Sequence, residues 1–151
     1  MRRLEMSWVI RRPAEDVWNF VTNFDNWAKA SISKGVWLRS PEGATVLGTT
    51  VETSRKMFGR SRHIHSYVVT EFEPFRVFGM TDKVPGMRRM NQRFTFEPAP
   101  DGTRVTRTAD LDLGRGRFLE PALHWMVRRT WPIETAGMTK LIEQGSPAAV
   151  V

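Results

Sequence analysis

The chain has 151 residues, a formal net charge of +7 and no cysteine. A chain of this length suits one domain that buries about 70% of the surface of its unfolded form, and the absence of cysteine excludes disulfides and thiolate chemistry. No apolar run approaches the ~20 residues of a membrane-spanning helix, and Glu5 and Ser7 interrupt any apolar signal core near the start, so we expect an unprocessed, cytoplasmic protein.

The first predicted elements are a strand and a short helix joined at a proline. Apolar residues alternate with polar ones from Leu4 to Ile10, which is the period-2 pattern of a half-buried strand. Pro13 suits the first turn of a helix, where its missing N–H costs nothing. Turn-forming residues around Asn23 then predict a break followed by a second short helix.

Six further strands are predicted in the middle of the chain, separated by turn signals rich in glycine and proline. They cover residues 35–39, 49–58, 61–72, 76–81, 88–97 and 103–113. Seven strands with short connections predict a curved antiparallel sheet rather than a parallel α/β fold. A final helix is predicted over residues 118–143, with an apolar side marked by Leu119, Leu123, Met126, Ile133, Gly137 and Leu141.

Four short motifs follow one another along the chain before this closing helix: Pro13–Trp18, Phe24–Trp27, Val69–Pro74 and Gly102–Val105. Their order and spacing over residues 2–144 resemble the START-like (SRPBCC) superfamily. That superfamily includes the polyketide cyclase/dehydrase proteins, the lipid-transfer START domains and the Bet v 1-like pollen allergens.

The resemblance implies an α+β helix-grip fold with an internal, mostly apolar cavity. In such a fold a curved seven-stranded antiparallel sheet surrounds a long C-terminal helix, and two short helices follow the first strand. The resemblance also implies a single ligand-binding domain over residues 1–144, and we expect residues 145–151 to form a flexible tail.

Arg107 is the main candidate for contact with a ligand. It shares a strand face with Val105, Ala109 and Leu111, so a cavity on that side would surround its guanidinium with apolar groups. A buried guanidinium needs an anionic or carbonyl partner, and Arg107 would therefore anchor a ligand carboxylate or polarise a ketone. The alternatives are a structural ion pair or an outward side chain after a β-bulge.

Three neighbours on one predicted strand face extend this ligand site. Gln92 lies between Met90 and Phe94 at even spacing, and it would add a hydrogen bond inside the cavity. The alternative for Gln92 is a core amide that neighbouring groups satisfy.

The remaining predicted ligand contacts lie on other elements. Arg55, together with Asp82, would line an entrance to the cavity. Met126 and Trp131 on the closing helix would supply large, adaptable apolar contacts. Core packing is the alternative for these last two residues.

His63, His65 and Tyr67 share one face of the strand over residues 61–72. Two histidines at this spacing point the same way, but a metal site needs a third ligand, and His124 lies on the distant helix, so no metal site is predicted. His65 or Tyr67 would assist proton transfer if it faced the cavity. The apolar face of the same strand, which includes Val68, is the expected cavity side, and exposure to solvent is the alternative for the histidines.

These observations favour a protein that binds a hydrophobic or aromatic small molecule, such as a lipid, a polyketide or a quinone-like compound. The alternative is a polyketide cyclase/dehydrase-like enzyme that acts on an aromatic polyketide intermediate, with Arg107 polarising a carbonyl and His65, Tyr67 or Gln92 assisting. No cofactor is predicted. Scattered basic residues argue against nucleic acid as a partner and leave open a peripheral contact with an anionic membrane. The oligomeric state also stays open.

Overall fold

The computed structural model describes residues 2–30, 36–57, 59–83 and 89–145 of the chain. The predicted tail therefore lies almost entirely outside the described residues. In chain order the elements are β1 (Arg2–Ile10), α1 (Ala14–Val21), α2 (Phe24–Ala30), β2 (Val36–Ser40), β3 (Thr50–Met57), β4 (Arg60–Glu73), β5 (Val77–Lys83), β6 (Arg89–Ala99), β7 (Gly102–Asp112), the 3₁₀ helix η1 (Gly114–Leu119) and α3 (Glu120–Glu143). No helix within the described ranges is long and apolar enough to cross a membrane.

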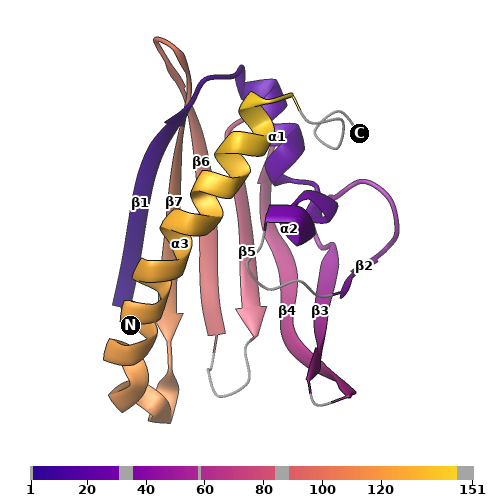
Figure 1. Ribbon diagram of the computed structural model, residues 1–151, viewed down its shortest axis with the longest axis vertical. Helices are drawn as coiled ribbons and strands as arrows, with labels where there is room; N and C mark the ends of the chain where they lie inside the picture. Colours follow the sequence, from indigo (N-terminus) through magenta and orange to yellow (C-terminus); the bar gives the residue numbers. More distant parts are fainter. Residues whose placement is uncertain (1, 31–35, 58, 84–88, 146–151) are drawn as a thin grey trace.

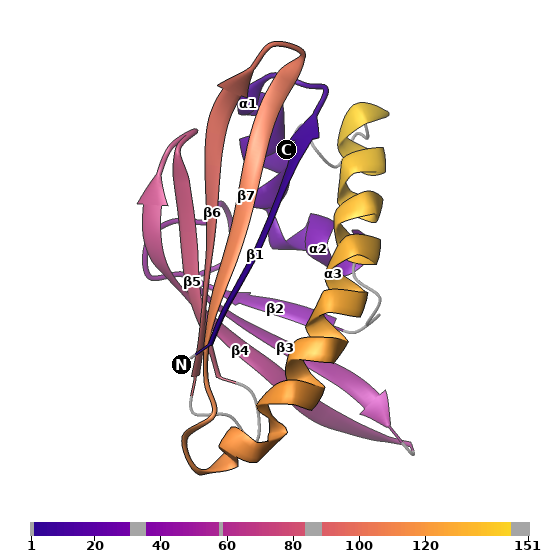
Figure 2. The ribbon, with the colours of Figure 1, turned by 90° about the vertical axis from the view of Figure 1, so that its left-hand side faces the viewer.

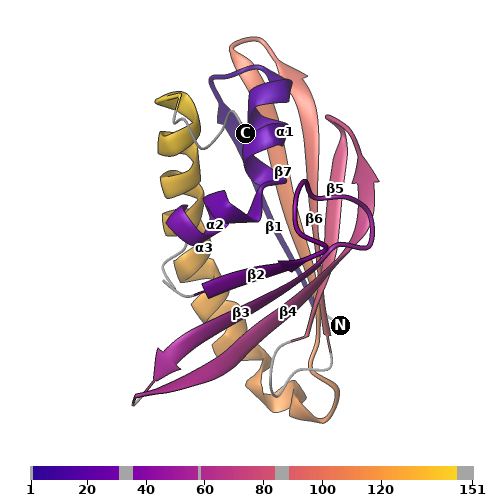
Figure 3. The same cartoon turned by 90° about the vertical axis from the view of Figure 1, so that its right-hand side faces the viewer.

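The seven strands form one antiparallel sheet in the order β1-β7-β6-β5-β4-β3-β2. The helix α3 crosses the concave side of this sheet, and α1 and α2 lie beside the upper half of α3 (Figure 1). Figures 2 and 3 show that the sheet is strongly curved: β1 and β7 run along α3, whereas β3 and β4 run at a steep angle to β1 and β7. This arrangement confirms the predicted helix-grip fold.

The apolar interior consists of two clusters. The larger one joins α1, α2 and the upper half of α3 to the sheet, and its fully buried rings include Phe20, Phe24, Phe78 and Phe94. The smaller cluster lies between the lower half of α3 and strands β1, β6 and β7. It contains Leu4, Met90, Ala109, Leu111, Val127 and Trp131. The alternation predicted for β7 is confirmed, because its odd-numbered residues from Thr103 to Leu111 are buried and the intervening ones are not.

The predicted apolar side of the closing helix was wrong in part: Leu123 and Leu141 pack against the two clusters, but they lie beside the buried stripe rather than within it. The buried stripe of α3 contains Val127, Trp131, Thr135, Met138 and Ile142, whereas the predicted stripe includes side chains that remain exposed. Met126 is 47% exposed and Ile133 is 62% exposed. Apolar residues occur around most of the circumference of this helix, so helical spacing alone fits more than one stripe.

The predicted cavity side of β4 was also wrong. Tyr67 and Val69 face the interior and are buried, whereas Val68 is exposed. The pairing with β5 shifts between Val69 and Glu71, which leaves Thr70 as an extra residue in the strand. Such a bulge exchanges the two faces of a strand, so Phe72 packs against the same core as Tyr67.

Candidate functional site

A row of four polar side chains crosses the interior from β5 to α3. Gln92 on β6 donates from Nε2 to Oδ2 of Asp82 on β5 at 2.7 Å. Arg107 on β7 donates from Nε and Nη2 to Oε1 of Gln92, at 3.2 and 2.7 Å. The third guanidinium nitrogen of Arg107, Nη1, donates to Oε1 of Glu134 on α3 at 2.8 Å. The amide of Gln92 therefore joins a carboxyl group and a guanidinium within one hydrogen-bonded row.

The strand register explains why these side chains meet. Asp82 lies opposite Met90, two residues before Gln92, and Arg107 lies opposite Phe94, two residues after Gln92. Successive members of the row are thus diagonal neighbours on the same face of adjacent strands, a separation that long side chains can span.

Aromatic rings surround the guanidinium of Arg107. Its Cζ atom lies 4.1 Å from the ring centroid of Trp131, 5.2 Å from that of Phe94 and 5.5 Å from that of Trp27. These separations are within the range of cation–π attraction. Arg107 is only 3% exposed, and the partly buried Glu134 supplies the opposite charge. This contact is the structural ion pair expected from the sequence as one alternative for Arg107.

Asp82 ends the row at a fully buried position. Its Oδ1 atom has no hydrogen-bond partner in the described part of the protein. Burial raises the pKa of the Asp82 carboxyl well above its ordinary value, and the hydrogen bond from Gln92 only partly opposes this shift. Tyr67 lies directly opposite Asp82 in the strand pairing, and burial likewise raises the pKa of its hydroxyl. Both groups therefore favour their neutral, proton-carrying forms.

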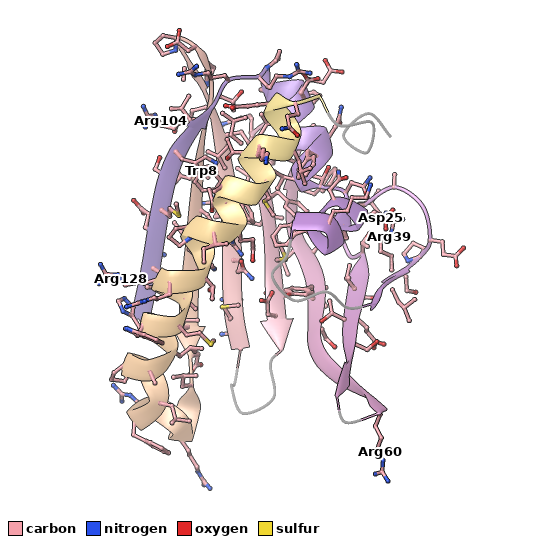
Figure 4. The ribbon with its side chains drawn as sticks, viewed as in Figure 1. Trp8, Asp25, Arg39, Arg60, Arg104 and Arg128 are labelled. Carbon is pink, nitrogen blue, oxygen red and sulfur yellow. The ribbon has the colours of Figure 1, made fainter. Side chains whose placement is uncertain are left out.

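A groove of about 580 Å³ lies between β1 and α3, beside this row. Its lining includes Met6, Trp8 and Val9 from β1 and Pro132, Thr135 and Thr139 from α3. Figure 4 labels Trp8 on β1, next to α3. Within this lining the Thr135 hydroxyl contacts the Met6 sulfur at 3.7 Å. Met6 is also the residue of β1 that pairs with Arg107 on β7, so the groove and the polar row are neighbours.

Two polar atoms at this groove are buried without a hydrogen-bond partner in the described part of the chain: Nε1 of Trp8 and Oγ1 of Thr139. An unsatisfied buried donor or hydroxyl is unfavourable and calls for an explanation. Both residues line the groove, although the two atoms themselves are covered.

The structure brings four of the predicted ligand-contact residues together, namely Gln92, Phe94, Arg107 and Trp131. Met90 lies in the smaller apolar cluster beside Trp131, and Met126 lies on the exposed side of α3. Their roles in ligand binding stay predictions.

The other predicted site residues lie on β3 and β4. Arg55, His63 and His65 belong to these strands, but their side chains lie outside the described part of the structure. Tyr67 points into the interior. Among the residues that are described, no group of three or more histidine, aspartate or glutamate side chains could hold a metal ion.

Sequence reasoning missed Glu134 and placed Asp82 at an entrance. The signal for Asp82 was present, because Phe78, Met80 and Asp82 alternate on β5 and all three are buried. Glu134 follows Trp131 by three residues and precedes Met138 by four, which places it next to the buried stripe of α3. Trp8 and Thr139 offered no comparable signal, since their unsatisfied atoms depend on how β1 and α3 meet.

The sequence profile of a family described as polyketide cyclase / dehydrase and lipid transport matches residues 1–142. No curated protein sequence matches the chain.

Several solved structures share the fold. The Zhui aromatase/cyclase from Streptomyces sp. R1128 has a TM-score of 0.73 and 16% identity, over 98% of this chain and 97% of that one. Protein SA2116 from Staphylococcus aureus has a TM-score of 0.75 and 11% identity, over 96% and 95%. Protein CV1439 from Chromobacterium violaceum has a TM-score of 0.70 and 17% identity, over 95% and 99%. At these identities the similarity is one of fold.

Proposed function

The chain belongs to the polyketide cyclase / dehydrase and lipid transport family, and from this membership we propose that it binds a hydrophobic or aromatic small molecule that carries hydrogen-bonding oxygen atoms. The binding site is the groove between β1 and α3. Its volume, about 580 Å³, suits a small organic ligand, since such sites usually measure roughly 300–1,000 Å³.

The observation that carries this proposal is the pair of unsatisfied polar atoms at the groove, Trp8 Nε1 and Thr139 Oγ1. A carbonyl or hydroxyl oxygen of the ligand accepts from the indole N–H, and the threonine hydroxyl can donate or accept. Neither atom is open to solvent, so binding at these atoms requires a rotation of the two side chains. Apolar groups of Met6 and Pro132 contact the rings or chain of the ligand.

The part of the groove at Met6 gives the ligand a path toward the polar row. Met6 lines the groove and contacts Thr135 there, and methionine side chains change rotamer easily. A ligand that displaces the Met6 side chain would reach the neighbourhood of Arg107. In that position a ligand oxygen can share the guanidinium with Gln92.

The groove is tested with 2-hydroxy-1,4-naphthoquinone, an aromatic probe that carries both carbonyl and hydroxyl oxygens. We expect the probe to quench tryptophan fluorescence in a saturable titration. Trp8→Phe and Thr139→Val should each weaken its binding by about 2- to 10-fold, the range expected for one neutral hydrogen bond. Trp125→Phe is the matched control, because Trp125 is exposed on another part of α3, and it should bind as the unaltered protein does.

Unchanged affinity in both groove variants would reject the groove as the binding site. Native mass spectrometry of the purified protein provides an independent check. A copurified aromatic or lipid molecule that is less abundant in the Trp8→Phe variant supports the proposal.

The enzyme alternative draws on one specific observation, the buried Asp82 carboxyl with its free Oδ1 atom. A carboxyl group that keeps its proton can donate a hydrogen bond to a ligand carbonyl. Arg107 is connected to Asp82 through Gln92, which is hydrogen-bonded to both residues. Cyclisation of a poly-ketone needs such activation together with orientation of the chain. Incubation with a linear poly-β-ketone, followed by chromatography and mass spectrometry, distinguishes the two functions. Cyclised product that forms faster with the protein, but not with Asp82→Asn, would support catalysis.

A further inference from the structure

Exposed apolar side chains concentrate on η1 and on residues 120–133 of α3. Phe118 is 78% exposed, Trp125 is 61% exposed and Ile133 is 62% exposed, and Leu119 and Met126 are exposed beside them. Single exposed apolar residues are normal on a protein surface, but a contiguous group of this kind marks a contact site.

These residues lie on the side of the helix that faces away from the sheet. The opposite side buries Val127 and Trp131 against the sheet. In Figures 2 and 3 no described element covers the outer side of the lower half of α3. The apolar group therefore faces solvent in this structure.

Arginines flank the same surface. Arg115 and Arg117 on η1 and Arg128 and Arg129 on α3 are all exposed, and the Arg129 guanidinium lies 4.9 Å from the ring centroid of Trp125. Figure 4 shows Arg128 on the lower half of α3. Glu120 is the single acidic residue between positions 115 and 133 of the sequence.

Of the two acidic residues just before η1, Asp110 is paired with Arg3, whereas Asp112 keeps its charge, so four arginines face two carboxylates, Asp112 and Glu120. Asp110 accepts two hydrogen bonds from Arg3, and Asp112 accepts one from the Gly114 amide. The surface thus combines exposed aromatic and aliphatic groups with a local excess of positive charge.

We propose that η1 and residues 120–133 of α3 form a docking surface for an anionic lipid bilayer. Tryptophan, phenylalanine and leucine partition into the boundary between headgroups and acyl chains, and arginine is attracted to anionic headgroups. A second copy of the chain fits less well, since a two-fold contact through this surface would bring its four arginines close to their own copies. A nucleic acid would match the charge but would leave Phe118 and Ile133 against phosphates.

Vesicle flotation tests this surface directly. Large vesicles of phosphatidylcholine with 30% phosphatidylserine should bind the protein at low ionic strength, whereas vesicles of phosphatidylcholine alone should bind it weakly. Raising NaCl from about 50 to about 500 mM should release much of the bound protein, because the Debye length becomes shorter. Tryptophan emission should shift to shorter wavelength in the bound state, because Trp125 leaves water.

Two charge-matched variants then locate the contact. Arg128→Gln with Arg129→Gln should weaken binding about tenfold or more. Arg60→Gln with Arg104→Gln removes the same charge from exposed positions on β4 and β7 that lie well away from Arg128 in Figure 4, and it should change binding much less. Urea unfolding curves establish that both variants remain folded.

A third variant, Ile133→Ser, tests the apolar part of the contact at constant charge, and it should also weaken binding. The inference is overturned if anionic vesicles do not bind at low salt, or if the two charge variants lose affinity equally. A dimer in sedimentation velocity that Ile133→Ser abolishes would assign the surface to a second copy instead. The groove is tested with a soluble probe, so either outcome leaves the proposed function as it stands.

Discussion

Asp82 shows how one residue determines the chemical character of the interior. The carboxyl is fully buried and accepts one hydrogen bond, from Gln92, while Oδ1 has no partner among the described residues. Burial favours the neutral form of a carboxyl because the charged form loses its hydration. The folded protein therefore holds a proton at Asp82 under conditions in which the unfolded chain releases it.

Asp82→Asn should change the pH dependence of stability. Because burial raises the pKa of Asp82 in the folded protein, the contribution of its carboxyl to stability is greatest below about pH 3.8, the ordinary pKa. That contribution is lost as the pH rises through the folded-state pKa. Asparagine stays neutral and can still accept the hydrogen bond from Gln92. The free energy of unfolding of Asp82→Asn, relative to that of the unaltered protein, should therefore increase as the pH rises above about 3.8. Urea unfolding between pH 4 and pH 8 measures this difference.

Glu97→Gln serves as the control for this series, since it removes an exposed carboxylate from the neighbouring strand β6. Its stability should run parallel to that of the unaltered protein across the pH range. A constant difference between Asp82→Asn and the unaltered protein would mean that Asp82 does not hold its proton in the folded state.

At the scale of elements, the hairpin between β6 and β7 packs against the junction of β1 and α1. Thr103 donates from its hydroxyl to the Arg12 carbonyl at 2.8 Å. A Cβ atom at Gly102 would lie 2.1 Å from the Ile10 carbonyl oxygen and 2.9 Å from the Arg11 Cα. Because both neighbours are backbone atoms, no side chain can move aside, and the position accepts only glycine.

Gly102→Ala should therefore lower the free energy of unfolding by about 2 kcal/mol or more, as expected for overpacking against backbone. Gly48→Ala is the matched control: Gly48 also has a positive φ, +86°, but its Cβ would meet nothing within 4 Å. The control should lose only the cost of the backbone conformation, about 1 kcal/mol. Equal losses in urea unfolding would contradict the close approach.

The two short helices are joined by side chains of α2 that contact carbonyls at the end of α1. Trp27 donates from Nε1 to the Val21 carbonyl at 2.7 Å, and Asn26 donates from Nδ2 to the Phe20 carbonyl at 3.1 Å. The last carbonyls of a helix lack partners within the helix itself. Asn26 and Trp27 on α2 therefore cap the C-terminal end of α1.

Trp27→Phe should destabilise the protein by about 1–2 kcal/mol, because the Val21 carbonyl loses its buried donor while an aromatic ring is kept. Trp125→Phe makes the same change at an exposed position, and it should alter stability by less than about 0.5 kcal/mol. Thermal unfolding of both variants checks the difference. A Trp27→Phe variant as stable as its control would show that the capping bond contributes nothing measurable.

At the scale of the whole molecule, the ion pair between Arg107 and Glu134 joins the sheet to α3. Removing one partner of a buried ion pair leaves the other charge uncompensated, which costs about 3 kcal/mol or more. Glu134 retains 17% side-chain exposure, so water relieves part of that cost. The pair is therefore a connection between the two layers as well as a candidate contact for a ligand.

A double-mutant cycle with Arg107→Met and Glu134→Gln measures this connection. Each single variant should lose stability, and the double variant should lose less than the two together, with a coupling of about 1–3 kcal/mol. The exposed pair of Arg93 and Glu71, at 2.7 Å, is the control, and Arg93→Met should cost less than about 1 kcal/mol. Strictly additive losses for Arg107 and Glu134 would show that the two residues do not stabilise each other.

Sequence reasoning succeeded where the signal is local. The alternation along β7 placed Arg107 on the buried face with Ala109 and Leu111, and the fold confirms this placement. The same reasoning failed for Tyr67, because the bulge at Thr70 depends on pairing with β5. Glu134, the charged partner of Arg107, lies 27 residues farther along the chain, and no periodicity connects residues on a strand and on a helix.

The sequence by itself determined the order of the strands and helices along the chain, the breaks at Pro13 and Asn23, and the family resemblance. Each of these depends on residues that are close together in the chain. Only the tertiary structure decided which stripe of α3 is buried, which polar groups meet around Arg107, and where a groove remains beside Trp8. The reason is physical. Contacts between distant segments depend on strand register and sheet curvature, and these follow from the packing of the whole core rather than from any local pattern.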